Sequence, residues 1–200
     1  YNQTKDIGIK PTPSIGGVGL IKDYKNMTTM DLKKIDNLIL IIGKTEGHLD
    51  QSIFARDILN EKNGPPPEVN LFNEKNNGET LLKLITKGYI KSAHDISLGG
   101  IIVAIAKMSI SGNKGIKIKK PNYLINQFEY FFGEDQGRYV IEIEKDDFKD
   151  VTSILDKSSV HYDELGIVIE KNLIIDEKTK VSIDELTTIN KNWLKEYMSK

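Results

Sequence analysis

The chain has 200 residues, no cysteine, and 28 lysines and arginines against 29 aspartates and glutamates, which gives a formal net charge of −1. A chain of this size can bury the core of one domain, and the lack of cysteine excludes a disulfide scaffold, a thiol nucleophile and a cysteine zinc site. The balanced charge argues against a general nucleic-acid binder, and no apolar run reaches the roughly 20 residues that a membrane span needs.

The first 24 residues are rich in glycine and proline, which predicts an extended segment that leads in from a preceding domain. A short strand is expected at its end, over Val18–Lys22. Residues 25–200 are expected to form a single domain. The chain starts with Tyr1, and no charged region followed by an apolar stretch precedes its body, so we interpret it as a piece cut from a longer protein.

The rest of the chain mixes two hydrophobic periods. Alternation or compact apolar runs predict strands at 37–43, 89–93, 116–118, 139–144, 161–171, 173–175 and 181–183. Helical spacing predicts helices at 50–59, 71–87, 101–110, 123–130, 146–157 and 183–198, the last with Trp193 on its apolar side.

Two strands differ in their expected exposure. The run at 37–43 has the composition of a central strand buried on both faces, whereas Ile116 and Ile118 alternate with Lys117 as in an exposed strand. The proline run at 64–67 predicts a loop. Because strands and helices do not alternate strictly, the predicted class is α+β, with a mixed β-sheet flanked by helices.

A polar glycine turn lies between the strand at 89–93 and the helix at 101–110. It reads His94, Asp95, Ile96, Ser97, Leu98, Gly99 and Gly100. Free N–H groups at a helix N-terminus favour an anion, so this turn is a candidate anion site. His94 beside Asp95 suits either proton transfer or a structural hydrogen bond, and Ser97 suits either a nucleophile or, more economically, a helix N-cap.

A second glycine-flanked loop precedes the strand at 139–144. It reads Gly133, Glu134, Asp135, Gln136, Gly137 and Arg138. Arg138, one of two arginines in the chain, can pair with Glu134 or Asp135 or reach a ligand phosphate. The loop amides suit an anion, but two adjacent carboxylates oppose one unless a metal intervenes.

Two other patterns do not indicate a binding site. The glycines at 16–19 follow prolines and lead into a strand-like segment, which does not fit a dinucleotide-binding turn. The three histidines are far apart in sequence, so no metal site is expected.

The two glycine loops resemble motifs of a known family. The run from Ser92 to Gly100 is similar to the HD-[IV]-S-x-GG signature of the aminoimidazole-ribonucleotide synthase superfamily, C-terminal domain. Tyr1-Asn2-Gln3-Thr4 with residues 11–16 resembles the junction before the last domain of phosphoribosylformylglycinamidine synthase, synthetase subunit. Residues 64–67 and 132–138 stand where that family has its R-P-P and F-x-E-S-Q-x-R elements, and order and spacing agree from Tyr1 to about Trp193.

The resemblance implies a purine-biosynthesis ligase that uses ATP and Mg2+ to activate the amide oxygen of formylglycinamide ribonucleotide and then substitutes ammonia derived from glutamine. Such a synthetase fuses two halves, and this chain looks like the C-terminal domain of the second. The implied partners are the remaining domains of the same synthetase, a glutaminase subunit and a small accessory subunit, in the cytoplasm, without nucleic acid or membrane.

The family's catalytic histidine and magnesium carboxylates lie on other domains, so the resemblance implies no catalytic or metal residue here and no cofactor required by this piece alone. The candidates for nucleotide or phosphate binding are His94, Asp95, Ser97, Gly99, Gly100, Gly133, Glu134, Asp135, Gln136 and Arg138. Two alternatives stay open: a domain of aminoimidazole ribonucleotide synthase, and a non-catalytic interaction domain with decayed glycine loops.

Two residues depart from the family pattern. Leu98 stands where the signature usually has Asp or Glu, and Asp135 replaces the usual Ser of E-S-Q. In the family, the second-half copy of this loop is associated with a pseudo-symmetric site without turnover that can hold a nucleotide. A carboxylate at 135 disfavours a substrate phosphate unless a cation neutralises it. Residues 1–200 alone are therefore expected to have no ligase turnover.

Overall fold

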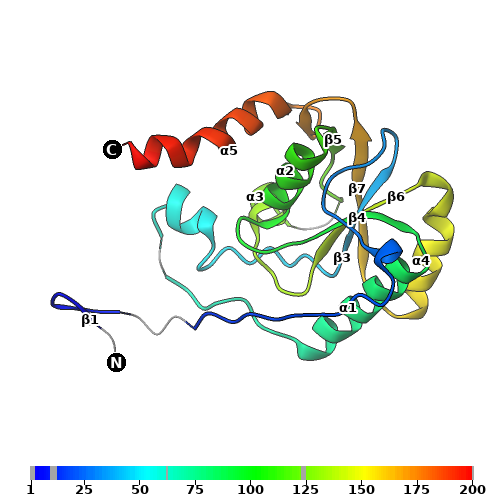
Figure 1. The fold of residues 1–200 in the computed structure, drawn as a ribbon, viewed down its shortest axis with the longest axis horizontal. Helices are drawn as coiled ribbons and strands as arrows, with labels where there is room; N and C mark the ends of the chain where they lie inside the picture. Colours follow the sequence, from blue (N-terminus) through cyan, green and yellow to red (C-terminus); the bar gives the residue numbers. More distant parts are fainter. Residues whose placement is uncertain (1–2, 10–12, 62, 123–124, 200) are drawn as a thin grey trace.

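The computed structural model describes residues 3–9, 13–61, 63–122 and 125–199. Within these ranges, seven strands form one mixed sheet in the order β4-β6-β3-β7-β5-β8-β9, and a short hairpin stands apart from it (Figure 1). The strands of the sheet are β3 (Leu38–Ile42), β4 (Ile90–Asp95), β5 (Gly115–Ile118), β6 (Tyr139–Ile143), β7 (Tyr162–Ile169), β8 (Leu173–Ile175) and β9 (Thr179–Val181). The hairpin strands are β1 (Gln3–Thr4) and β2 (Ile7–Gly8).

β3 is the central strand that the sequence predicts. It pairs antiparallel with β6 on one side and with β7 on the other. Ile39 and Ile41 point into one hydrophobic core, whereas Leu40 and Ile42 point into a second core on the opposite face. All neighbouring pairs of the sheet are antiparallel except β5 with β8, so the sheet is mixed, as predicted.

Helices cover both faces of this sheet, as Figure 1 shows, with α2, α3 and α5 on one side and α1 and α4 on the other. Their bounds are α1 (Leu71–Thr86), α2 (Gly100–Gly112), α3 (Gln127–Phe132), α4 (Phe148–Lys157) and α5 (Ile183–Met198). Two short 3-10 turns, η1 (Tyr24–Asn26) and η3 (Lys145–Asp147), and one π-helical turn, η2 (Phe54–Ile58), complete the elements. None of the described helices combines the length and apolar composition that crossing a bilayer requires.

Three predicted elements differ in the structure. Residues 18–22 are extended and exposed but form no strand, because no strand within the described residues pairs with them. The helix expected at 50–59 is only the π-helical turn η2, and its end is exposed at Ile58 and Leu59. β5 is an interior strand between β7 and β8, with Lys117 the exposed member of an otherwise buried run.

Smaller differences concern element ends. β4 extends through His94 and Asp95, which pair with β6 instead of belonging to the turn. The last hairpin strand ends at Val181, and Ile183 begins α5. The predicted helix at 123–130 is α3, which starts at Gln127. Tyr123 and the junction residues Tyr1, Asn2, Pro11 and Thr12 lie outside the described residues.

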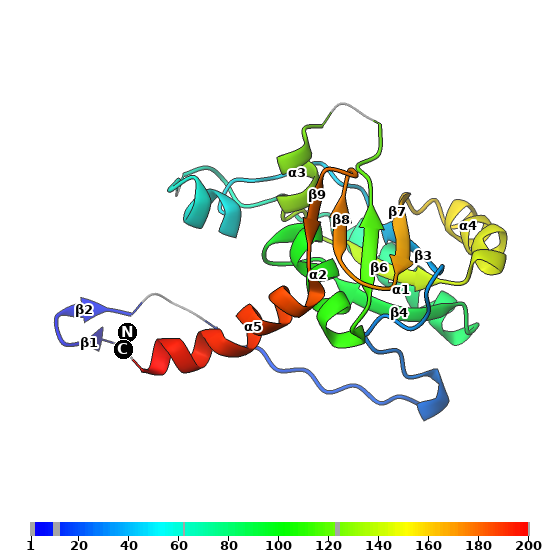
Figure 2. The same ribbon diagram turned by 90° about the horizontal axis from the view of Figure 1, so that it is seen from above.

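The final helix α5 lies partly outside the packed body. Its first turn is buried at Ile183, and Leu186 packs against the core beside α2. Farther along, the helix projects away from the sheet, as Figure 2 shows, and Trp193 is 57% exposed. The predicted apolar side of this helix is therefore present, but its distal half is not covered by any described part of the chain.

Candidate functional site

The loop at 133–138, between α3 and β6, is held from the inside by Arg138. The guanidinium is 1% exposed and donates hydrogen bonds to the Asp135 carbonyl (3.2 Å), the Gly133 carbonyl (2.7 Å) and Thr45 Oγ1 (3.1 Å). It also forms an ion pair of 3.5 Å with the Asp135 carboxylate. Of the pairings that the sequence left open, the structure shows the one with Asp135, and the guanidinium ties the loop together.

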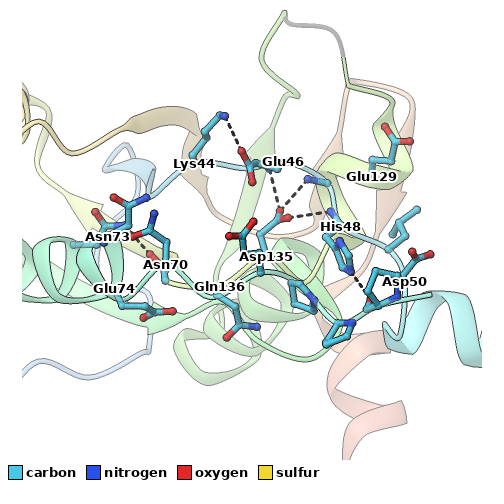
Figure 3. Close-up of a pocket in the computed structure, with 18 residues that line it drawn as sticks. Lys44, Glu46, His48, Asp50, Asn70, Asn73, Glu74, Glu129, Asp135 and Gln136 are labelled. Carbon is cyan, nitrogen blue, oxygen red and sulfur yellow. Dashed lines mark hydrogen bonds and ion pairs between the residues drawn. The ribbon is translucent and has the colours of Figure 1, made fainter. Parts of the chain in front are cut away.

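The Asp135 carboxylate accepts three successive backbone N–H groups. Oδ2 lies 3.1 Å from the amide nitrogen of Glu46 and 2.9 Å from that of Gly47, and Oδ1 lies 3.0 Å from that of His48. Figure 3 shows the side chain pointing into this turn. A run of amides that converges on one anion is typical of a backbone nest. Here the anion is supplied by the chain itself.

The carboxylate of the neighbouring Glu134 also accepts backbone N–H groups, one of them at the start of α2. Its Oε1 accepts the backbone N–H of Gly99 and that of Ile53, both at 2.8 Å. The Gly100 N–H donates to the Ser97 carbonyl. Because α2 begins after Gly99, with a φ of +84°, Ser97 is not its N-cap. The predicted N-cap is wrong, and the N–H groups of the two glycines are not free to receive a ligand.

His94, Asp95 and Ser97 stand apart from the pocket described below. The Nδ1 atom of His94 lies 2.6 Å from the Asp95 carbonyl oxygen and 3.2 Å from Asp95 Oδ1. This local contact at the end of β4 corresponds to the structural interpretation of the His–Asp pair. None of the three residues lines the pocket.

A pocket of about 740 Å3 lies beside the 133–138 loop (Figure 3). Five parts of the chain line it: the 44–50 turn after β3, the proline loop at 65–68, the N-cap and first half of α1, Glu129 of α3, and residues 135–137. Its lining holds six carboxylates, those of Glu46, Asp50, Glu68, Glu74, Glu129 and Asp135. Of the ten predicted binding residues, only Asp135 and Gln136 line it.

Positive charge in this pocket is scarce. Lys44 is the one lysine or arginine among the described lining residues, and its ammonium lies 2.7 Å from the Glu46 carboxylate. The hydrogen bond to Glu46 and its charge raise the pKa of Lys44. His48 Nε2 lies 2.9 Å from the Pro65 carbonyl oxygen, which ties the 44–50 turn to the proline loop.

Sequence reasoning missed most of this lining. Asn70, the N-cap of α1, and Asn73 and Asn77 within α1 lie at helical spacing, and all three line the pocket. Such a polar stripe on a helix that also carries a buried apolar face is a signal that the sequence contained. The 44–50 turn had a weaker signal, in Gly47 within it and Gly43 just before it, because at their φ angles of +82° and +94° a Cβ atom would clash with neighbouring atoms.

An antiparallel-rich mixed sheet is covered on both faces, and the glycine turn of α2 packs on the 131–133 backbone. Residues 34–177 match the family described as AIR synthase related protein, C-terminal domain. The chain belongs to this family, which confirms the predicted fold class.

Matches to individual proteins are narrower than the match to the family. The chain is 75% identical over 198 residues to phosphoribosylformylglycinamidine synthase subunit PurL of Pelagibacter ubique, a match that covers 99% of this chain and 27% of the relative. Solved structures of T. maritima PurL complexed with FGAR and with ATP share the fold, with TM-scores of 0.67 and 0.62 and 19% and 18% identity. Each covers 82% of this chain, and this chain spans 30% and 27% of theirs.

These comparisons confirm the resemblance that the glycine loops predicted. They also show that this chain spans about a quarter of the length of such a relative.

Proposed function

We propose that this chain is a domain of the synthetase subunit of phosphoribosylformylglycinamidine synthase. The whole enzyme is then the ATP-dependent ligase that converts formylglycinamide ribonucleotide and glutamine-derived ammonia into formylglycinamidine ribonucleotide in de novo purine biosynthesis. The observation that carries this proposal is the high identity to the Pelagibacter ubique relative along almost the entire chain. The same identity favours this enzyme over aminoimidazole ribonucleotide synthase.

The place of the chain in that enzyme is part of the proposal. Residues 25–200 act as the C-terminal domain of the second half, and residues 1–24 lead in from the domain before it. The remaining domains, a glutaminase subunit and a small accessory subunit are its partners, in the cytoplasm. The Pelagibacter ubique relative is a synthase subunit, which supports an assembly.

The described residues do not fit a magnesium ion. They contain no group of three or more histidine, cysteine, aspartate or glutamate side chains arranged to hold a metal. The glycine-turn amides, which would suit the phosphates of ATP, already donate to Glu134 and Asp135. We therefore assign ATP and Mg2+ to other parts of the enzyme and expect this domain alone to require neither.

The structure favours a supporting role for this domain in the reaction. The carboxylates of Glu134 and Asp135 occupy the amides of the loops around them. This agrees with the alternative of an interaction domain within the same assembly, in which the 94–100 and 133–138 segments hold the fold together. Direct phosphate contacts by the predicted candidates, from His94 to Arg138, are not required for this role. The domain supplies a pocket wall and a surface for its neighbours.

The isolated 200-residue chain is expected to have no ligase turnover, because no catalytic group of the family is assigned to it. The measurement is ADP release and formation of amidine product from formylglycinamide ribonucleotide, ATP, Mg2+ and ammonium. The intact synthetase that contains this chain is the positive control. Product formed by the folded 200-residue chain alone would contradict the proposal.

A further inference from the structure

The amides of residues 46–48 form the kind of site that proteins use for phosphate. Three consecutive N–H groups converge on one point at distances of 2.9 to 3.1 Å, and the point is occupied by the Asp135 carboxylate. A phosphate oxygen needs the same donors in the same place. The two anions therefore compete for one nest.

The carboxylate is firmly held in that nest. Asp135 is 8% exposed, and the Arg138 guanidinium behind it is 1% exposed. An incoming anion that displaced the carboxylate would have to break an ion pair as well as three hydrogen bonds. Removing one partner of a buried charge pair is costly, because the other charge stays buried without compensation.

The rest of the pocket adds to this barrier. Five further carboxylates line it, and its lysine lies against one of them. Like charges at short range repel, and the repulsion is stronger in a recess than in open solvent. These charges disfavour anions in the pocket, but the 46–48 amides donate to Asp135, so the carboxylate at 135 decides whether the nest itself can take an anion.

We propose that Asp135 determines ligand specificity in this pocket: its carboxylate fills the 46–48 nest, so the chain excludes phosphate-bearing ligands, and loss of that carboxylate creates a phosphate site. The inference concerns binding by this chain and does not depend on the activity of the whole enzyme. It assigns to Asp135 the role of an internal substitute for a phosphate group.

The test compares four forms of the 200-residue chain: wild type, Asp135→Gly, Asp135→Ser and Glu68→Gly. Glu68 is exposed and lines the same pocket, so Glu68→Gly removes one pocket charge without touching the nest. Inorganic phosphate and ADP are titrated into each form by calorimetry, and 15N NMR follows the backbone amides of residues 46–48. Circular dichroism and thermal melting establish which variants are folded.

Wild type and Glu68→Gly are expected to show no saturable phosphate binding up to about 10 mM, whereas a folded Asp135 variant binds at least about tenfold more tightly. The amide signals of residues 46–48 move only in the Asp135 variants. Two variants are used because either one can fail to fold. Saturable binding of phosphate or ADP by the wild type, with shifts at 46–48, overturns the inference without any variant. Equal binding by wild type and a folded Asp135 variant overturns it as well.

Discussion

Replacing Glu142 with alanine is expected to lower the free energy of unfolding by about 3–5 kcal/mol, because hydrogen-bond donors inside the protein lose their acceptor. Glu142 lies on β6 and is fully buried. Its carboxylate accepts four hydrogen bonds of 2.7 to 3.0 Å, from the backbone N–H groups of Lys33 and Lys34, the Asn37 amide and the Ser92 hydroxyl.

The same carboxylate fixes the course of the chain before β3. Residues 33–37 connect the extended lead-in to the central strand, and Glu142 holds them against the sheet from more than 100 residues away. Glu142→Gln keeps the volume and one acceptor oxygen but brings an NH2 group to the donors. We expect an intermediate loss, of about 2 kcal/mol.

Urea denaturation followed by circular dichroism measures both changes. The matched control is Glu164→Ala on β7, where the side chain is exposed, and its effect should stay within about 0.5 kcal/mol. A loss of less than about 1 kcal/mol for Glu142→Ala would show that water or a rearranged backbone satisfies the donors.

Gly100→Ala is expected to destabilise the protein by about 2–4 kcal/mol, through backbone strain and a steric clash. Gly100 has a φ of +68°. An added Cβ atom would lie 2.7 Å from the Gly133 carbonyl oxygen and 2.8 Å from that of Phe131. Both contacts are with backbone, which cannot rotate away, so α2 and the 131–133 segment would have to separate.

Gly78→Ala in α1 is the control for this substitution. A Cβ atom at Gly78 has Tyr139 Oη at 3.6 Å as its nearest neighbour, and the residue lies inside a helix. Alanine there should stabilise the protein by about 0.5–1 kcal/mol. Thermal melting of the two variants should therefore give shifts of opposite sign. A melting temperature unchanged by Gly100→Ala would contradict the close packing of this turn.

The parts of the fold that the sequence predicts well depend on local pattern. β3 and β6 are compact or alternating apolar runs, and their burial follows from composition alone. The interior position of β5 could not be predicted in this way, because its lysine alternation is identical for an edge strand and for an interior strand with one exposed face. Only the pairing with β7 and β8 distinguishes the two.

The candidate site was predictable in its segments but not in its contacts. The sequence indicates both glycine loops, but it leaves three partners open for Arg138: Glu134, Asp135 or a ligand phosphate. The partners of Asp135 and Glu134 lie 35 to 89 residues away in the chain, at Gly99, Ile53 and the 46–48 turn. No local sequence pattern indicates a contact between residues so far apart in the chain. The sequence therefore indicated amides suited to an anion, but it could not show that two acidic side chains of the chain already occupy them.

Adjacent positions 134 and 135 tie together segments that are far apart in sequence. Glu134 joins the start of η2 to the start of α2, and Asp135 joins the turn after β3 to the buried Arg138. A local opening of any one segment must break bonds to the same two residues. These segments therefore form one cooperative unit, in which partial unfolding of one releases the others.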